Sequence, residues 1–345
     1  MNSVKQSKSN SLPIYLTPVA PILKFWKWIN QRGYAQGVFW AILVCLISSL
    51  NDVFTRLAGT RLESMEVAFL RLFFMTLTLL PVMLYFNRSA FKTKRPGFHA
   101  ARALLGYGAI AAWCAGVAAT PLVIACTIAQ TVPLFVLPMA FLVLGEKIGW
   151  QRTLATVTGF IGIMIVLQPT ANGSQFSFIN LNLGALWLLG AAILFAASDI
   201  LNKIMVSKES DLTMLFYFAA GTACIGIIPA YMVWQTPSLT EILWLLCLGA
   251  GANLILYCLL KAFAATEISA LQPYRYVELF FASGFGFVLF GELIGLTALI
   301  GAAIIISSTL TIAYYETHLR RKEAKINKAA LDLPPKTKTK QRLVA

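Results

Sequence analysis

The sequence predicts an all-α polytopic membrane protein: ten transmembrane helices arranged as two inverted repeats of five. Three observations predict it: the composition, the spacing of the apolar runs, and motifs that occur twice. Apolar residues make up 58% of the 345 residues and charged residues only 12%, whereas soluble proteins average about 45–50% and about 25%. A soluble fold could not bury so much apolar surface, so the expected solvent is the bilayer.

Ten apolar runs are each long enough to cross the hydrocarbon core, which takes about 20 residues. The expected spans are 37–58, 65–86, 101–119, 121–144, 150–169, 183–205, 212–234, 241–262, 267–290 and 294–315. The third and fourth spans are separated only by "ATPL" (119–122), and the ninth and tenth by "GELIG" (291–295). These two boundaries rest on short turn signals.

The formal net charge of +14 is concentrated in both tails and in alternate loops, and Arg61 is the one basic residue expected on the opposite side. Under the positive-inside rule this asymmetry places both termini in the cytoplasm. Residues 1–36 are expected to form a basic cytoplasmic segment and residues 317–345 a basic, disordered tail. No basic face is interleaved with aromatic residues, so nucleic acid is not an expected partner.

The sequence contains few residue patterns that are typical of enzyme active sites. The six cysteines lie in apolar runs without CxxC or CxxH spacing, and the two histidines, His99 and His318, stand in a basic loop and in the tail. Neither a nucleophile elbow nor a phosphate loop is present. We therefore expect no enzyme, no cofactor and no metal site.

Opposite charges four residues apart occur twice inside apolar spans. Asp52 and Arg56 in the first span recur as Asp199 and Lys203 in the sixth, 147 residues later. Residues i and i+4 share a helix face, so each pair can neutralise itself, where an unpaired charge costs about 3 kcal/mol. Two interpretations stay open: structural ion pairs, or carboxylates facing a water-filled cavity that bind a cation or proton. Arg71 is expected to be structural, with Glu66 or Asp52 as its partner.

A second motif repeats at nearly the same interval. "LGEKIG" (144–149) recurs as "FGELIG" (290–295), 146 residues later. The chain therefore divides into a first five-helix repeat over 37–170 and a second over 183–316. An odd number of spans inverts the second copy, and inverted repeats are typical of alternating-access carriers.

The ninth span carries the strongest candidate for a substrate pathway. It reads "LQPYRYVELF", with Arg275 and Glu278 three residues apart beside Tyr276. Pro273 can open the helix there, which is tolerated where backbone lines a cavity. The two-pronged guanidinium of Arg275 suits a carboxylate. A structural pair between Arg275 and Glu278 is the alternative.

Other candidates for substrate contact have packing or helix–helix hydrogen bonding as their alternative role. They are Trp113, Gln130, Asn253 and Tyr257.

Several segments carry a resemblance to a known family. "NDVFTRLAGTRLESMEVAFLRLFF", "GEKIGWQRTLATVTGFIGIMIVLQP" and "LLKAFAATEISALQPYRYVELF" resemble the EamA-type repeats of the drug/metabolite transporter superfamily. The resemblance covers residues 36–316. Within the superfamily these segments are similar to the bacterial S-adenosylmethionine uptake transporters.

The resemblance implies a secondary transporter that imports S-adenosylmethionine across the bacterial inner membrane by alternating access, with exchange for S-adenosylhomocysteine as one mode. The alternative is a carrier, exporter or importer, of another small metabolite such as an amino acid, a vitamin or a drug. For S-adenosylmethionine, Arg275 would meet the carboxylate, Asp52 or Glu278 the cationic centres, and Tyr276 or Trp113 the adenine ring. The expected partners are this small molecule and the lipid bilayer; the oligomeric state is not predicted.

Overall fold

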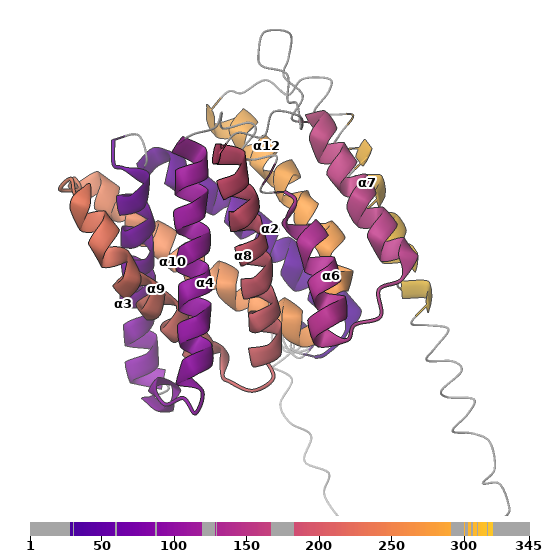
Figure 1. Ribbon diagram of the computed structural model, residues 1–345, viewed down its shortest axis with the longest axis horizontal. Coiled ribbons are helices and arrows are strands. Elements are labelled where there is room, and N and C mark those ends of the chain that lie inside the picture. Colours follow the sequence, from indigo (N-terminus) through magenta and orange to yellow (C-terminus); the bar gives the residue numbers. More distant parts are fainter. Residues whose placement is uncertain are drawn as a thin grey trace, which may run out of the picture.

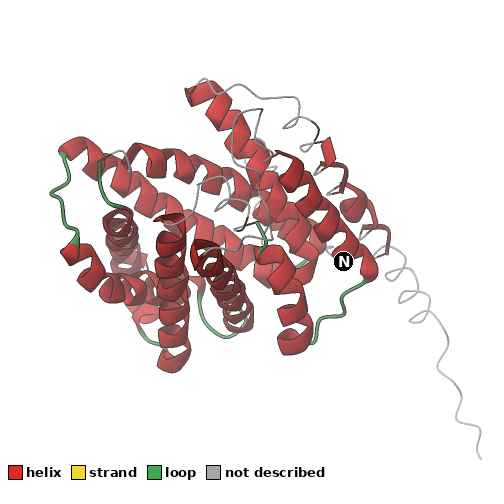
Figure 2. Ribbon diagram, turned by 45° about the horizontal axis from the view of Figure 1, so that its top comes forward, coloured by secondary structure: helices red, strands yellow, loops and turns green. Residues whose placement is uncertain are grey.

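The structure is a computed structural model in which the described residues are 28–29, 31–58, 61–86, 88–118, 128, 130–166, 183–290, 300, 303–304, 306–308, 310–315 and 317–319. Within these residues the fold is entirely helical, with no strand (Figure 2). This confirms the predicted all-helical class.

The helices follow one another with short connections and lie side by side as a bundle (Figure 1). In chain order they are α2 (Tyr34–Ala58), α3 (Ser64–Phe86), η2 (Arg88–Phe91), α4 (Pro96–Ala118), α6 (Val132–Leu144), α7 (Trp150–Val166), α8 (Leu183–Met205), α9 (Asp211–Met232), α10 (Leu239–Ala265), α11 (Ile268–Leu271), η3 (Gln272–Tyr276) and α12 (Val277–Phe290). Described residues from 303 to 319 are also helical.

The helices overlap the predicted spans, with informative differences. In place of the predicted fourth span at 121–144, the described helix α6 begins only at Val132, after a turn at 130–131. Five of the described helices are long and apolar enough to cross a membrane: those in 34–55, 65–85, 183–205, 211–232 and 239–265. The ninth span is not one helix but three pieces, α11, η3 and α12. Residues 317–319, predicted to begin the tail, are helical. The predicted breaks at "ATPL" and "GELIG", and the tail beyond 319, lie outside the described residues.

The packing of the helices follows the repeat. The most extensive contacts are those of α2 with α10 and of α4 with α8, and these two pairs exchange when each helix is replaced by its counterpart in the other half. The contacts of α3 with α10 and of α4 with α9 correspond in the same way, as do those of α6 with α8 and of α2 with α12. Each half therefore packs its first helix against the third helix of the other half, and the two halves share one interior.

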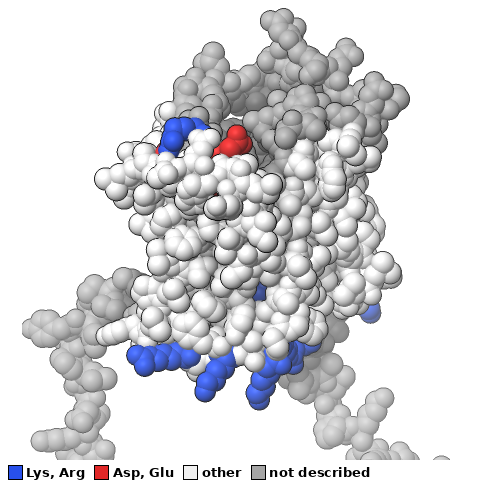
Figure 3. Space-filling model, turned by 60° about the vertical axis from the view of Figure 1, so that its left-hand side comes forward, with Lys and Arg blue, Asp and Glu red and all other residues white. Residues whose placement is uncertain are grey.

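Charge is distributed unevenly between the two ends of the bundle. Figure 3 shows Lys and Arg side chains gathered along the lower end, where the α3–α4 and α8–α9 connections turn in Figure 1. Exposed Arg88, Lys92 and Lys94 belong to the first of these connections and Lys208 to the second. At the other end Arg61 donates to both carboxylate oxygens of Glu241, at 2.9 and 2.6 Å.

Candidate functional site

An ion pair joins two of the predicted charged residues inside the bundle. Nη1 of Arg275, in η3, donates to Oδ2 of Asp199, in α8. The Asp199 side chain is 10% exposed and that of Arg275 is 35% exposed. Asp199 is therefore paired across helices and not with Lys203, as the four-residue spacing had predicted. The Arg275 side chain is therefore only partly buried, and its ion pair uses one of its guanidinium nitrogens.

The position of Arg275 depends on the break in the ninth span. Pro273 has no N–H and follows the four-residue α11, and the chain then winds as the tighter η3 before α12 begins. Proline removes a helical hydrogen bond, and a 3-10 stretch inside a helix often marks a functional joint. The helix changes to a 3-10 turn at Pro273, and the predicted exposure of backbone groups to a cavity stays a prediction.

Three side chains of α2 form hydrogen bonds with residues 274–278 of this segment. Ser48 Oγ donates to the Glu278 carboxylate, and Ser49 Oγ donates to the Glu278 backbone carbonyl at 2.9 Å. Cys45 Sγ donates to the Tyr274 carbonyl at 3.4 Å. The sequence reading missed these three residues, although Ser48 stands four residues before Asp52 and so shares its helix face.

Asp52 and Arg71 complete the group. Arg71 lies within electrostatic range of Asp52 and of Glu278, and Asp52 is exposed. Of the two partners considered for Arg71, Asp52 is the one it faces. The side chain of Arg56 lies outside the described side chains, so its pairing with Asp52 stays a prediction. We call the group formed by Asp52, Arg71, Asp199, Arg275 and Glu278 the central charged cluster.

Lys203 has a different role from the one its spacing predicted. Its ammonium group donates to the backbone carbonyls of Phe263 and Thr266, where α10 ends. The last carbonyls of a helix have no partner within the helix and carry partial negative charge, so a cation is stabilised there. Lys203 thus ties α8 to the end of α10.

The central charged cluster carries an excess of acid. Its three carboxylates face two guanidinium groups, for a formal charge of −1 over these five side chains. Charges at membrane depth are retained at ligand and ion pathways, because elsewhere their desolvation is not compensated. Guanidinium and carboxylate groups side by side can bind a zwitterion, and the excess carboxylate favours a ligand with an additional positive charge.

Comparisons with known proteins agree with this architecture. The model of the EamA-like transporter family matches the chain twice, over residues 35–168 and 182–314. The chain belongs to the EamA-like transporter family.

Among its curated relatives, the S-adenosylmethionine uptake transporter of Rickettsia prowazekii is 41% identical over 285 residues, 83% of this chain and 95% of the relative. The protein of the same name from Rickettsia bellii is also 41% identical, over 83% of this chain and 96% of the relative. The riboflavin transporter of Vibrio cholerae is 30% identical over 84% of this chain and 97% of its own. A solved crystal structure has a TM-score of 0.68 at 16% identity, covering 83% of this chain and 96% of the other.

In this EamA-like transporter the two aromatic candidates for the adenine ring pack against other helices. Tyr276 is completely buried, and its ring packs so tightly on α7 that a Cβ at Gly159 would meet it at 2.3 Å. Trp113 packs with Ala185 and Leu188 of α8. In this conformation the Tyr276 ring is not available to an adenine.

The polar candidates of α10 are engaged in helix packing. Asn253 Nδ2 donates to the Met75 carbonyl of α3 at 2.7 Å and to Thr78 Oγ1 at 3.0 Å. Tyr257 stacks edge-on against Trp40 of α2, with ring centroids 6.0 Å apart. Gln130 is partly buried just before α6. For Asn253 the contacts favour the helix–helix alternative.

We expect replacement of Asn253 by alanine to destabilise the transporter by about 1 kcal/mol, the usual contribution of an interhelical hydrogen bond in a membrane. The half-saturation concentration of its substrate should not change. Unfolding in mixed micelles measures the first quantity and uptake kinetics the second. Thr78→Val is the comparison variant: it removes the longer of the two Asn253 bonds together with the hydroxyl's own bonds to the Phe74 and Met75 carbonyls. A tenfold rise in the half-saturation concentration for Asn253→Ala would return this residue to the substrate site.

Proposed function

We propose that this chain imports S-adenosylmethionine across a bacterial inner membrane by alternating access of its two inverted repeats. The observation that carries the proposal is the 41% identity, over 83% of the chain, to transporters named for S-adenosylmethionine uptake. The relatives named for riboflavin are 30% identical or less. Substrate and direction therefore follow the more similar group.

The chemistry of the central charged cluster supports this substrate. S-adenosylmethionine has one carboxylate, one ammonium and one sulfonium, so its net charge is +1, opposite to the formal −1 of the cluster. Arg275 pairs with Asp199 through one nitrogen and offers its remaining N–H groups to the carboxylate, while Asp52 and Glu278 face the two cationic centres. Riboflavin has no cationic centre, so the excess carboxylate of the cluster would remain uncompensated.

The distribution of charge supports an orientation. The basic end of the bundle, which holds the α3–α4 and α8–α9 connections, lies in the cytoplasm under the positive-inside rule. Both termini are then cytoplasmic. Exchange against S-adenosylhomocysteine is the proposed coupling. This product lacks the sulfonium charge, so the acidic cluster binds it less strongly than S-adenosylmethionine and releases it more readily.

The proposal predicts saturable uptake of radiolabelled S-adenosylmethionine by bacterial cells that express the chain, and none by cells with the empty vector. Unlabelled S-adenosylhomocysteine should compete, whereas riboflavin should not at the same concentration. Preloading right-side-out vesicles with S-adenosylhomocysteine should accelerate uptake. Uptake of labelled riboflavin without uptake of S-adenosylmethionine, from a well-expressed protein, would refute the substrate and leave the carrier fold intact.

A further inference from the structure

The repeated glycine–glutamate turn has a structural role that its sequence does not disclose. Gly145 ends α6 with φ of +67°, in the left-handed region that glycine adopts without a steric penalty. The Glu146 N–H then returns to the Ala140 carbonyl at 3.2 Å, a hydrogen bond typical of a helix end closed by glycine. This turn directs the Glu146 side chain away from α6 and into the second repeat.

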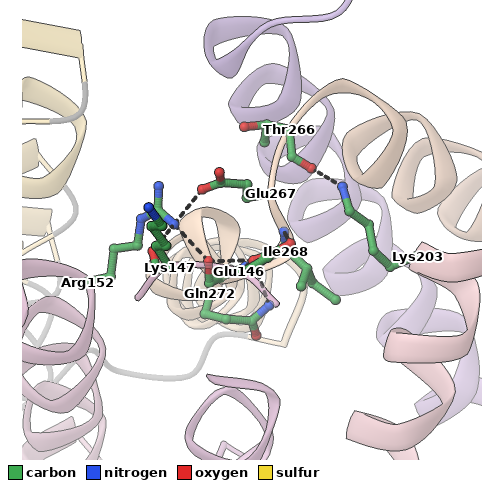
Figure 4. A network of polar contacts seen from close by, with 9 residues as sticks. Glu146, Lys147, Arg152, Lys203, Thr266, Glu267, Ile268 and Gln272 are labelled. Atoms are coloured by element: carbon green, nitrogen blue, oxygen red, sulfur yellow. Dashed lines mark hydrogen bonds and ion pairs between the residues drawn. The ribbon is translucent and has the colours of Figure 1, made fainter. Parts of the chain in front are cut away.

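Glu146 caps a helix that belongs to the other half of the chain. Its carboxylate accepts the backbone N–H groups of Ile268 and Ser269, at 2.9 and 3.0 Å, and the Ser269 hydroxyl at 2.6 Å (Figure 4). These N–H groups open α11, and its own preceding residue, Glu267, makes no side-chain cap. The unpaired N–H groups at a helix start favour a carboxylate. Here the first repeat supplies it.

Arg152 of α7 makes a second contact between the repeats at the same place. Its Nη1 donates to the Ser269 hydroxyl at 2.9 Å and forms an ion pair with the Glu267 carboxylate. Figure 4 shows Arg152 and Glu146 converging on the start of α11 from the same side, with Lys203 reaching the end of α10 from the other. We call the contacts of Glu146 and Arg152 with residues 267–269 the α11 clamp.

The α11 clamp lies directly before the segment that carries Arg275 of the central charged cluster. Arg275 follows Ser269 by six residues, through one turn of α11 and the 3-10 turn of η3. Cys45, 2% exposed, lies under this stretch with its thiol on the Tyr274 carbonyl. The clamp also lies at the end of α8 and α10 that the basic connections share. A displacement of α11 would therefore uncover the cluster from this end.

The composition of the clamp suits a contact that opens and closes. It consists of a few polar bonds between the two repeats, and polar groups leaving such bonds can be rehydrated at the membrane surface, whereas separating packed apolar helices there has no such compensation. Alternating access requires contacts between the repeats to break on one side while those on the other side form.

We propose that the α11 clamp is the cytoplasmic gate of the carrier, with Glu146 and Arg152 as positioning residues that hold the Arg275 segment closed. The gate is closed in this structure. It opens when α11 leaves the Glu146 carboxylate, which exposes the cluster to the cytoplasm and releases the substrate. The inference rests on the proposed function for its direction and on the structure for its residues.

The test measures access to Cys45 and needs no transported substrate. A variant that keeps Cys45 and has alanine at the other five cysteines is reacted with a membrane-impermeant maleimide in inside-out vesicles, which present the cytoplasmic face. Glu146→Ala in this background should raise the labelling rate of Cys45 at least tenfold. Lys147→Ala, a change of charge at the adjacent exposed position, is the matched control and should leave the rate unchanged.

A milder variant keeps the proposal testable where Glu146→Ala fails to fold. Ser269→Ala removes the two hydroxyl bonds of the clamp but leaves both backbone N–H groups on Glu146, and it should raise the labelling rate a fewfold. Equal rates in well-folded Glu146→Ala and Lys147→Ala variants would overturn the gate. Acceleration only in right-side-out vesicles would overturn its cytoplasmic placement.

The outcomes separate the gate from the substrate. If Glu146→Ala exposes Cys45 but no variant transports S-adenosylmethionine, the gate stands and the proposed substrate is wrong. If S-adenosylmethionine is transported normally while labelling is unaffected in every variant, the proposed function stands and the gate is wrong.

Discussion

Replacement of Arg275 by glutamine is expected to reduce S-adenosylmethionine uptake by about 100-fold. The guanidinium pairs with Asp199 through one nitrogen, and the Arg275 side chain as a whole is 35% exposed. Loss of one partner in a desolvated, charge-assisted contact costs about 2–5 kcal/mol, which corresponds to roughly 30- to 5,000-fold in affinity. Initial rates of uptake, normalised to the amount of protein in the membrane, measure the effect.

A purely structural ion pair would also make this variant defective, because Asp199 would be left buried and unpaired at a cost of about 3–5 kcal/mol. The double variant Asp199→Asn with Arg275→Gln separates the two explanations. It contains no unpaired charge at either position, and the two amides can bond to each other. We expect the double variant to regain the amount of folded protein and not the uptake.

The matched single variant Asp199→Asn completes a double-mutant cycle. It leaves Arg275 without its carboxylate but with its charge, so a substrate carboxylate can still bind it, and uptake should fall less than in Arg275→Gln. Recovery of uptake in the double variant to near the original rate would show that the pair only holds α8 against η3, and Arg275 would then lose its place in the substrate pathway.

The pattern of charges in the sequence singled out the residues of the central charged cluster, but it did not predict which of them are in contact. Asp199 and Lys203 share a helix face, and the local rule pairs them. In the folded bundle each finds a partner elsewhere: Asp199 pairs with Arg275, 76 positions along the chain, and Lys203 bonds to the end of α10. The spacing rule describes an isolated helix, whereas partners within a membrane bundle are set by helix packing, which one sequence does not disclose.

The repeat was the most informative feature of the sequence because it constrains packing as well as topology. An inverted duplication predicts that contacts between unlike helices recur in the other half, and the pairs α2–α10 and α4–α8 do so. The sequence showed the glycine–glutamate turn as a repeated motif. The left-handed conformation at position 145 explains why the motif contains glycine. The role of Glu146 could not be predicted, since the N–H groups it caps belong to a helix more than 120 residues away.

Replacement of Gly249 by alanine is expected to destabilise the protein by about 2 kcal/mol, although alanine is by itself the better helix former. A Cβ at Gly249 would lie 2.5 Å from the Met75 nitrogen and 2.6 Å from the Phe74 carbonyl carbon. Both are backbone atoms of α3, so no side-chain rotation relieves the clash, and α3 and α10 have to separate. Overpacking of this kind costs about 1–3 kcal/mol, and helix propensity returns at most about 1 kcal/mol.

Gly190 of α8 is the matched control, because a Cβ there meets nothing within 4 Å. Gly190→Ala should be neutral or stabilise the protein by up to about 1 kcal/mol through helix propensity alone. Unfolding in mixed micelles measures both variants, and equal effects would show that α3 and α10 do not approach as closely as the structure places them.

The separation of α3 and α10 should also affect transport. Asn253, one turn beyond Gly249 in α10, donates its hydrogen bond to Met75 of α3. Arg71 precedes Met75 by one turn of α3 and lies within electrostatic range of Asp52 and Glu278. A shift of α3 away from α10 therefore displaces a member of the central charged cluster. We expect Gly249→Ala to lose uptake per folded molecule as well as stability, whereas Gly190→Ala should keep both.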